Sequence, residues 1–74
     1  MARGKYITEF ERDCIRIGVF YGASGAAIAR FLGRTKGGVR NHIERMRADG
    51  TIEDVPFAFV RAEIGRVILS HEVR

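Results

Sequence analysis

The chain has 74 residues, of which 46% are hydrophobic and 30% are charged, and its formal net charge is +4. This length supports one small domain, and the balance of apolar and charged residues is typical of a folded chain rather than a disordered one. No apolar run approaches the roughly 20 residues that span a bilayer. A single cysteine, Cys14, beside only two histidines excludes a disulfide scaffold and a zinc finger. The sequence therefore predicts a soluble, cytoplasmic protein with no membrane segment, metal or cofactor.

The basic residues are concentrated in the middle of the chain. The net charge is +1 over residues 1–23, +5 over residues 24–47 and −2 over residues 48–74. A local positive charge of this size suits a polyanion such as nucleic acid, although like charges also gather on ordinary solvated helix faces. The spacing of the apolar residues has to distinguish the two interpretations.

The chain begins with a short basic segment. Residues 1–7 contain no periodic apolar positions, so they are predicted to form a flexible basic arm. Residues 8–74 are predicted to form a single domain, because nothing in their composition marks a linker or a repeat.

A first helix is predicted over residues 9–21. Thr8 and Glu11 have the spacing of a capping box, which marks a helix start, and Gly22 is suited to end the helix. Its expected buried stripe consists of Phe10, Cys14, Ile17 and Tyr21. Ile15 and Val19 form a second ridge, expected on the opposite side, that needs cover from the fold or from another subunit.

Two further helices are predicted on either side of a short turn. Ser24 and Thr35 are good N-caps, and Gly33 and Gly50 are good helix ends, so the second of these helices covers about residues 35–49. The residues expected to face the core are Ile28, Phe31 and Leu32 in the earlier helix and Val39, Ile43 and Met46 in the later one. This spacing is typical of a helix-turn-helix.

The C-terminal region, residues 57–73, allows two interpretations. Its residues alternate between apolar and polar as in a β-hairpin, with a turn at Gly65 and Arg66, and several are β-branched. The same residues also carry a stripe with helical spacing, but a helix leaves Gly65 in its interior unexplained. We expect the hairpin, which gives an α+β, mainly helical fold with a three-helix core and a C-terminal wing. The alternative is an all-α fold with a fourth helix.

The stretch Ile28 to Ile43 resembles a bacterial or phage helix-turn-helix. The family pattern has a small residue in its first helix, here Ala29, a glycine four positions later, here Gly33, and apolar residues at two points of the second helix, here Val39 and Ile43. Its continuation to residue 52 is similar to winged-helix regulators, and the segment also resembles the DNA-binding parts of resolvases and of GcrA-type cell-cycle regulators. The resemblance covers about residues 24–52 and implies that residues 35–49 form a DNA-recognition helix.

The exposed face of this helix supplies the predicted DNA contacts. A recognition helix reads base edges from the major groove, while basic side chains around it contact phosphates. The expected base contacts are Gly37, Arg40, Asn41 and Glu44, with Asn41 on adenine and Arg40 on guanine. The expected phosphate contacts are Arg30, Arg34, Thr35, Lys36, Arg45 and Arg47. Arg61 and Arg66 are expected on the wing.

Several of these residues have alternative interpretations. Gly37 and Gly38 depart from the usual helix formers at a recognition-helix start, and they either allow close approach to DNA or simply weaken the helix. Glu44 either accepts from cytosine or pairs with Arg40. His42 is interpreted as a packed or partly exposed histidine. Cys14 is interpreted as a buried thiol.

Together these features predict a non-enzymatic, nucleoid-associated protein that binds double-stranded DNA. No paired carboxylates, phosphate-binding loop or nucleophile with its base can be assembled from the residues present. The leading expectation is a transcriptional regulator acting as a homodimer, whose dimer surface consists of Ile15, Val19, Phe59 and Ile68. The alternatives are a protein-binding adaptor or inhibitor of phage or mobile-element origin, and an accessory protein in DNA packaging or recombination.

Overall fold

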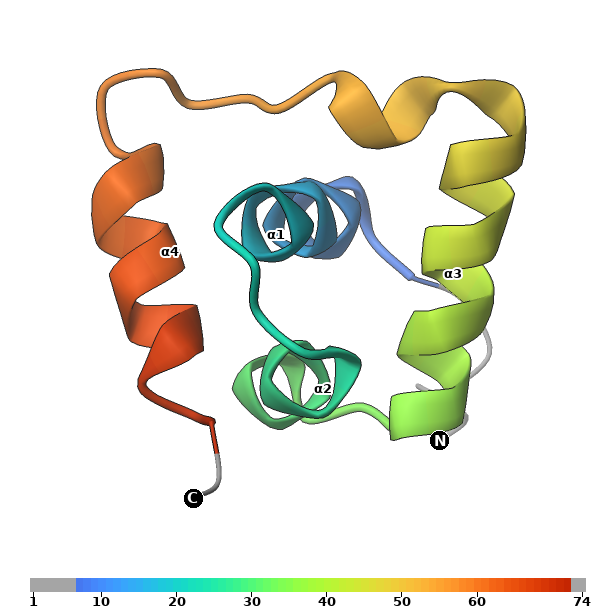
Figure 1. Ribbon diagram of the computed structural model, residues 1–74, viewed down its shortest axis with the longest axis horizontal. Helices are drawn as coiled ribbons and strands as arrows, with labels where there is room; N and C mark the ends of the chain where they lie inside the picture. The colour runs from blue at the N-terminus through green and yellow to red at the C-terminus, as the bar shows by residue number, and fades with distance from the viewer. Residues whose placement is uncertain (1–6, 73–74) are drawn as a thin grey trace.

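A computed structural model describes residues 7–72 of the chain. These residues contain four α-helices and one 3₁₀ helix, joined by loops. They are α1 (Glu9–Phe20), α2 (Gly25–Leu32), α3 (Lys36–Asp49), η1 (Thr51–Glu53) and α4 (Arg61–Leu69). In Figure 1, α1 and α2 are seen nearly end-on, one above the other, with α3 on one side of the pair and α4 on the other. α3 and α4 each pack against both helices of the pair but not against each other.

Side-chain caps start the first three helices where the sequence predicts them. The Thr8 hydroxyl accepts from the Glu11 amide at 3.1 Å, and the Glu11 carboxylate accepts from the Thr8 amide at 2.9 Å, which completes the capping box. Ser24 accepts from the Ala27 amide at 3.1 Å at the start of α2. Each cap satisfies an amide that has no partner within the helix.

Left-handed glycines end α2 and α3. Gly33 and Gly50 have φ angles of 69° and 82°, a conformation that other residues adopt only with strain. The three predicted helices and the predicted helix ends at Gly33 and Gly50 are therefore confirmed.

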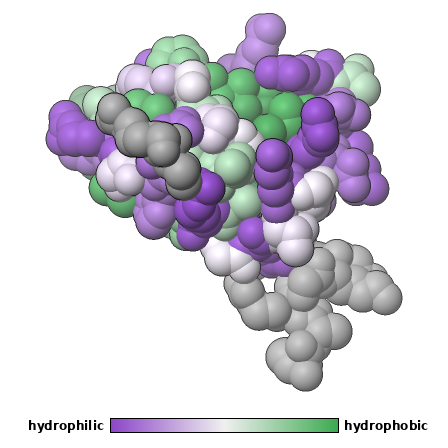
Figure 2. Space-filling view, turned by 60° about the horizontal axis from the view of Figure 1, so that its bottom comes forward, coloured by the Kyte–Doolittle hydropathy of each residue, from purple (hydrophilic) through white to green (hydrophobic). Residues whose placement is uncertain are grey.

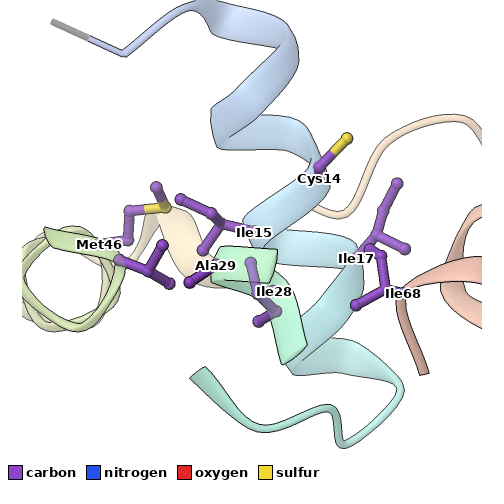
Figure 3. Packing of buried hydrophobic residues seen from close by; sticks show 8 residues of the cluster. Cys14, Ile15, Ile17, Ile28, Ala29, Met46 and Ile68 are labelled. Carbon is purple, nitrogen blue, oxygen red and sulfur yellow. The ribbon is translucent and has the colours of Figure 1, made fainter. Parts of the chain in front are cut away.

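Side chains from all four helices form one core. Its fully or almost fully buried members are Cys14, Ile15, Ile17, Ile28, Ala29, Val39, Met46 and Ile68. In Figure 3, Ile15 of α1 points to the side of Met46, whereas Ile17 points to the side of Ile68. Because α1 lies between α3 and α4, it is buried on two sides.

This position of α1 corrects the predicted helix faces. Ile15 is fully buried, so it belongs to the core and not to a dimer surface, and the same holds for Ile68. Phe10, expected in the buried stripe, is 56% exposed. A single apolar stripe is the pattern of a helix that packs against its neighbours on one side, whereas α1 packs against neighbours on two sides.

The predicted β-hairpin wing is wrong, and the alternative of a fourth helix is right. The described residues contain no strand, and residues 61–69 form α4. Gly65 lies in the middle of α4 because the Tyr21 ring packs directly on its backbone: a Cβ atom at Gly65 would lie 2.5 Å from the ring. The fold of residues 7–72 is therefore all-α.

The end of the described chain is fastened to α2. The carboxylate of Glu72 accepts from both the amide and the hydroxyl of Ser24, each at 2.8 Å. Arg30 donates to the carbonyl oxygen of His71 at 2.8 Å, and the His71 ring packs edge-on against Phe31. These contacts hold the segment that follows α4 along α2, from the N-cap Ser24 to the last turn at Arg30 and Phe31.

Two remaining expectations concern the chain ends and membranes. The predicted arm, residues 1–7, lies outside the described residues except for Ile7, which packs against the core. Within residues 7–72, no helix combines the length and apolar character needed to cross a lipid bilayer.

Candidate nucleic-acid interface

α3 turns its apolar stripe inward and its polar face outward, in the orientation that the sequence predicts. Val39 and Met46 are buried, and Ile43 packs against the core from a partly buried position. Arg40 and Asn41 are exposed. Within residues 7–72 the outward face of this helix, which at about 1.5 Å per residue is roughly 21 Å long, is exposed.

One edge of this outward face carries three basic side chains, which we call the first flank: Lys36, Arg40 and Arg47. All three are exposed, and they line an open groove of about 460 Å³ together with Glu44 of α3, Gly22 of the turn before α2 and Gly25 at the start of α2. In the described part of the chain none of the three has an ion-pair partner. Their positive charges therefore face solvent.

The opposite edge, the second flank, consists of Arg45 of α3 with Arg12 of α1. Both line a smaller groove of about 290 Å³, together with His42. Arg12 is held by an exposed ion pair with Glu9 at 2.9 Å. Burial and, to a smaller extent, the neighbouring charge of Arg45 lower the pKa of His42, which favours the neutral form of this half-buried imidazole.

Between the flanks lies a strip with little charge, the central strip. Its exposed members are Gly37, Asn41, Glu44 and Ala48. Helix geometry places them 140° to 200° from Val39 around the axis, at about 100° per residue. No ion pair joins Glu44 to Arg40 in residues 7–72, and the exposed Glu44 side chain lies at the border of the strip, where it also lines the groove of the first flank.

The hydropathy of the surface agrees with a polar outward face on α3. In Figure 2, the bottom of Figure 1 is brought forward, and hydrophilic side chains dominate the right-hand edge, the side on which α3 lies. This face contrasts with the inner stripe of α3, which is part of the core.

Arg34, predicted to contact phosphate, lies instead in an ion pair that fixes the turn before α3. Its Nε and Nη2 atoms donate to the two carboxylate oxygens of Glu11 at 2.9 and 2.8 Å, and both side chains are almost buried. The Arg34 guanidinium is the main reason why the pKa of Glu11 falls to about 2. This bidentate pair joins the start of α1 to the turn between α2 and α3, and thereby orients α3.

Sequence reasoning missed this pair because 23 residues separate its members. The capping box already gave Glu11 a role, and nothing in the local pattern indicates a second one.

Two other predicted phosphate contacts also have structural partners. Arg30 donates to His71 as described above, at an exposed position. The Thr35 side chain accepts from the Gly38 amide at 3.1 Å and caps α3. Lys36, Arg45 and Arg47 therefore remain as the predicted phosphate contacts whose charges have no partner in residues 7–72.

The two arginines predicted on a wing lie on α4, which packs on the far side of α1 and α2 from α3 (Figure 1). Arg66 is exposed. The Arg61 guanidinium lies 5.1 Å from the centre of the Phe20 ring and donates to the Val55 carbonyl oxygen at 3.4 Å. Arg61 lines a groove that reaches the C-terminal end of α3 at Arg47, whereas Arg66 does not line it.

Few other side chains in residues 7–72 could act as a nucleophile or bind a metal ion. Cys14 is buried as predicted, and burial raises its pKa to about 11, so the thiol stays protonated. Within residues 7–72, no three His, Cys, Asp or Glu side chains are grouped in a way that could hold a metal ion. No model of a known protein family, no curated protein and no solved structure matches the chain.

Proposed function

We propose that this protein binds double-stranded DNA by inserting α3 into the major groove, and that it acts as a small transcriptional regulator. The observation that carries the proposal is the division of the exposed face of α3 into two basic flanks and a central strip of low charge. The major groove is about 12 Å wide, and a helix with its side chains measures roughly 10–12 Å across. A helix in that groove has phosphates along both edges and bases in front.

The central strip is the part of α3 that would read bases. The amide of Asn41 can pair with the N6 and N7 atoms of adenine, and the Glu44 carboxylate can accept from N4 of cytosine. Gly37 has nothing within 4 Å of the place where a Cβ would be, so the backbone there is open to close approach. Arg40, at the border of strip and flank, can reach the O6 and N7 atoms of guanine.

The flanks would supply affinity without sequence preference. Lys36 and Arg47 lie along one edge and Arg45 along the other, with Arg12 beside it. Each phosphate contact releases counterions, so it adds about −0.9 to the slope of log K against log salt concentration. A complex made by these residues therefore weakens steeply with added salt.

The test begins with selection of bound duplexes from a random pool at a stated salt concentration. Fluorescence anisotropy then measures affinity for the selected duplex and its single-base variants. Asn41→Ala should relax the preference at one base position, because a bidentate contact discriminates by about 1–3 kcal/mol. Lys36→Ala should weaken all duplexes about equally and reduce the salt slope by about 1.

Arg66→Ala is the matched control, since it removes an exposed positive charge from α4, away from α3. It should leave the affinity and the salt slope almost unchanged. A complex that is insensitive to salt, or one that loses as much affinity from Arg66→Ala as from Lys36→Ala, would contradict the proposal.

A further inference from the structure

The loop before α4 and the end of α1 form an exposed apolar surface, which we call the aromatic patch. Its members are Phe20, Phe57, Phe59 and Val60, which are 54%, 41%, 98% and 49% exposed. Arg61 joins the two segments, because its guanidinium lies over the Phe20 ring and its amide donates to the Phe57 carbonyl oxygen at 2.7 Å. Large aromatic side chains exposed to this degree mark an interaction surface.

An open groove of about 540 Å³ lies directly beside the aromatic patch. Its apolar lining comes from Val19, Phe20, Ile52 and Val55. The patch therefore provides a protruding ring, that of Phe59, and the groove beside it is an apolar depression that could receive such a ring.

The backbone holds the loop in a conformation that an aromatic residue rarely adopts. Phe57 has a φ angle of 58°, in the left-handed region that favours glycine and asparagine. Its carbonyl oxygen accepts from the amides of Val60 and Arg61, which closes the turn that leads into α4. The hydrogen-bonded turn fixes the backbone of the loop, from which the Phe59 side chain projects into solvent.

We infer that the aromatic patch binds the same patch of a second copy of this chain about a two-fold axis. In a two-fold interface the same surface of each copy has to carry both the projecting group and the site that receives it. Each Phe59 ring therefore enters the groove of the other copy. The charges around the groove meet the same requirement, because both signs are present: Glu53 is acidic, and Arg47 and Arg61 are basic. A partner with one sign of charge would match only part of this rim.

The area of the patch suits a dimer of small proteins. With about 200 Å² for a fully exposed aromatic side chain, the exposed parts of the four residues amount to roughly 450 Å². A stable interface buries about 800 Å² on each partner. The aromatic patch supplies more than half of that area, and the groove and its charged rim surround it.

The proposed interface leaves the beginning of α3 free. The groove contacts α3 only through Arg47, near the C-terminal end of that helix. The inference itself does not depend on DNA binding, because self-association is measured without DNA.

Sedimentation equilibrium over a range of protein concentrations tests the inference. The wild-type chain should form dimers and nothing larger, because a two-fold interface closes on itself. Phe59→Ser should raise the dimer dissociation constant by about tenfold or more, as expected for a central aromatic anchor. The substitution leaves the fold intact, since this side chain is 98% exposed.

Phe10→Ser is the matched control. Phe10 is also an exposed aromatic residue, but it lies in the first turn of α1, ten residues and roughly 15 Å along the helix from Phe20. The control should dimerise like the wild type. A wild-type chain that stays monomeric up to about 1 mM would overturn the inference and leave a different protein as the occupant of the patch. Open-ended association, or equal weakening by the two substitutions, would also overturn it.

Discussion

α3 and α4 lie on opposite sides of the α1 and α2 pair, and they are stabilised in different ways. α3 has 14 residues, a side-chain cap from Thr35 and a left-handed glycine at its end. α4 has nine residues, and its N-cap residue, Val60, provides no side-chain cap. Short uncapped helices are marginal alone, so α4 depends on its buried contacts, above all Ile68 and the packing of Gly65 on Tyr21. A helix whose ends are satisfied locally can leave a whole face free for a ligand.

The largest expected effect comes from removing the main buried contact of α4. Ile68→Ala should lower the free energy of unfolding by about 2–5 kcal/mol, because a fully buried isoleucine is replaced by a cavity. Val67→Ala, at the neighbouring and 48% exposed position, should cost much less. Urea unfolding measures both values. If the two substitutions cost the same, the helix does not depend on burial of Ile68.

A smaller effect is expected at the other side of the molecule, where Glu11 and Arg34 fix the turn before α3. Glu11→Gln should lower the free energy of unfolding by about 2 kcal/mol at pH 7, the typical value of a hydrogen bond to a charged group. Glu9→Gln removes an exposed carboxylate of the same helix and should have little effect.

The same pair predicts a pH dependence. The pKa of Glu11 is lowered from 4.5 to about 2 in the folded chain, chiefly by Arg34. Its contribution to stability is therefore complete above about pH 4.5 and is lost as the pH falls toward 2. The stability difference between wild type and Glu11→Gln, measured by urea unfolding, should shrink over that range. A difference that stays constant from pH 7 to pH 2 would show that the Glu11 charge does not stabilise the fold.

The smallest effects on stability are expected from substituting one glycine in α4, Gly65, and one in α3, Gly37. Gly65→Ala should destabilise the fold by about 1 kcal/mol, because the clash with the Tyr21 ring outweighs the better helix propensity of alanine. Gly37→Ala meets no atom within 4 Å and should stabilise the fold by up to about 1 kcal/mol.

Gly37→Ala also separates the two interpretations of this glycine. If Gly37 allows close approach to DNA, the substitution should weaken DNA binding in anisotropy measurements even though it stabilises the chain in thermal unfolding. If binding is unchanged or stronger, Gly37 only weakens the start of the helix.

The sequence predicted α1, α2, α3 and the outward direction of Asn41, because caps, left-handed glycines and apolar spacing are local signals. It gave α4 only as the alternative to a hairpin, because residues 57–73 satisfy the spacing of a strand as well as that of a helix. Gly65 illustrates the reason: a glycine at a turn and a glycine under an aromatic ring look the same in sequence, and only the position of Tyr21 distinguishes them.

The candidate interface was predictable to the same degree. The exposed position of Lys36 and Asn41 follows from the spacing of Val39 and Ile43 on one helix. The pairing of Arg34 with Glu11 and the second buried side of α1 at Ile15 depend on how the helices pack, and no local pattern contains that information. Long-range contacts therefore decided which of the predicted basic residues are free.

The most direct test of the central claim is to follow backbone amide resonances by ¹⁵N NMR while a selected DNA duplex is added. The account predicts that the amides of α3, from Lys36 to Arg47, shift most, that the start of α2 shifts less, and that Arg66 and the rest of α4 change little. Shifts concentrated on α4 or on the Phe57 to Val60 loop, with α3 unchanged, would contradict the assignment of α3 as the DNA-binding helix.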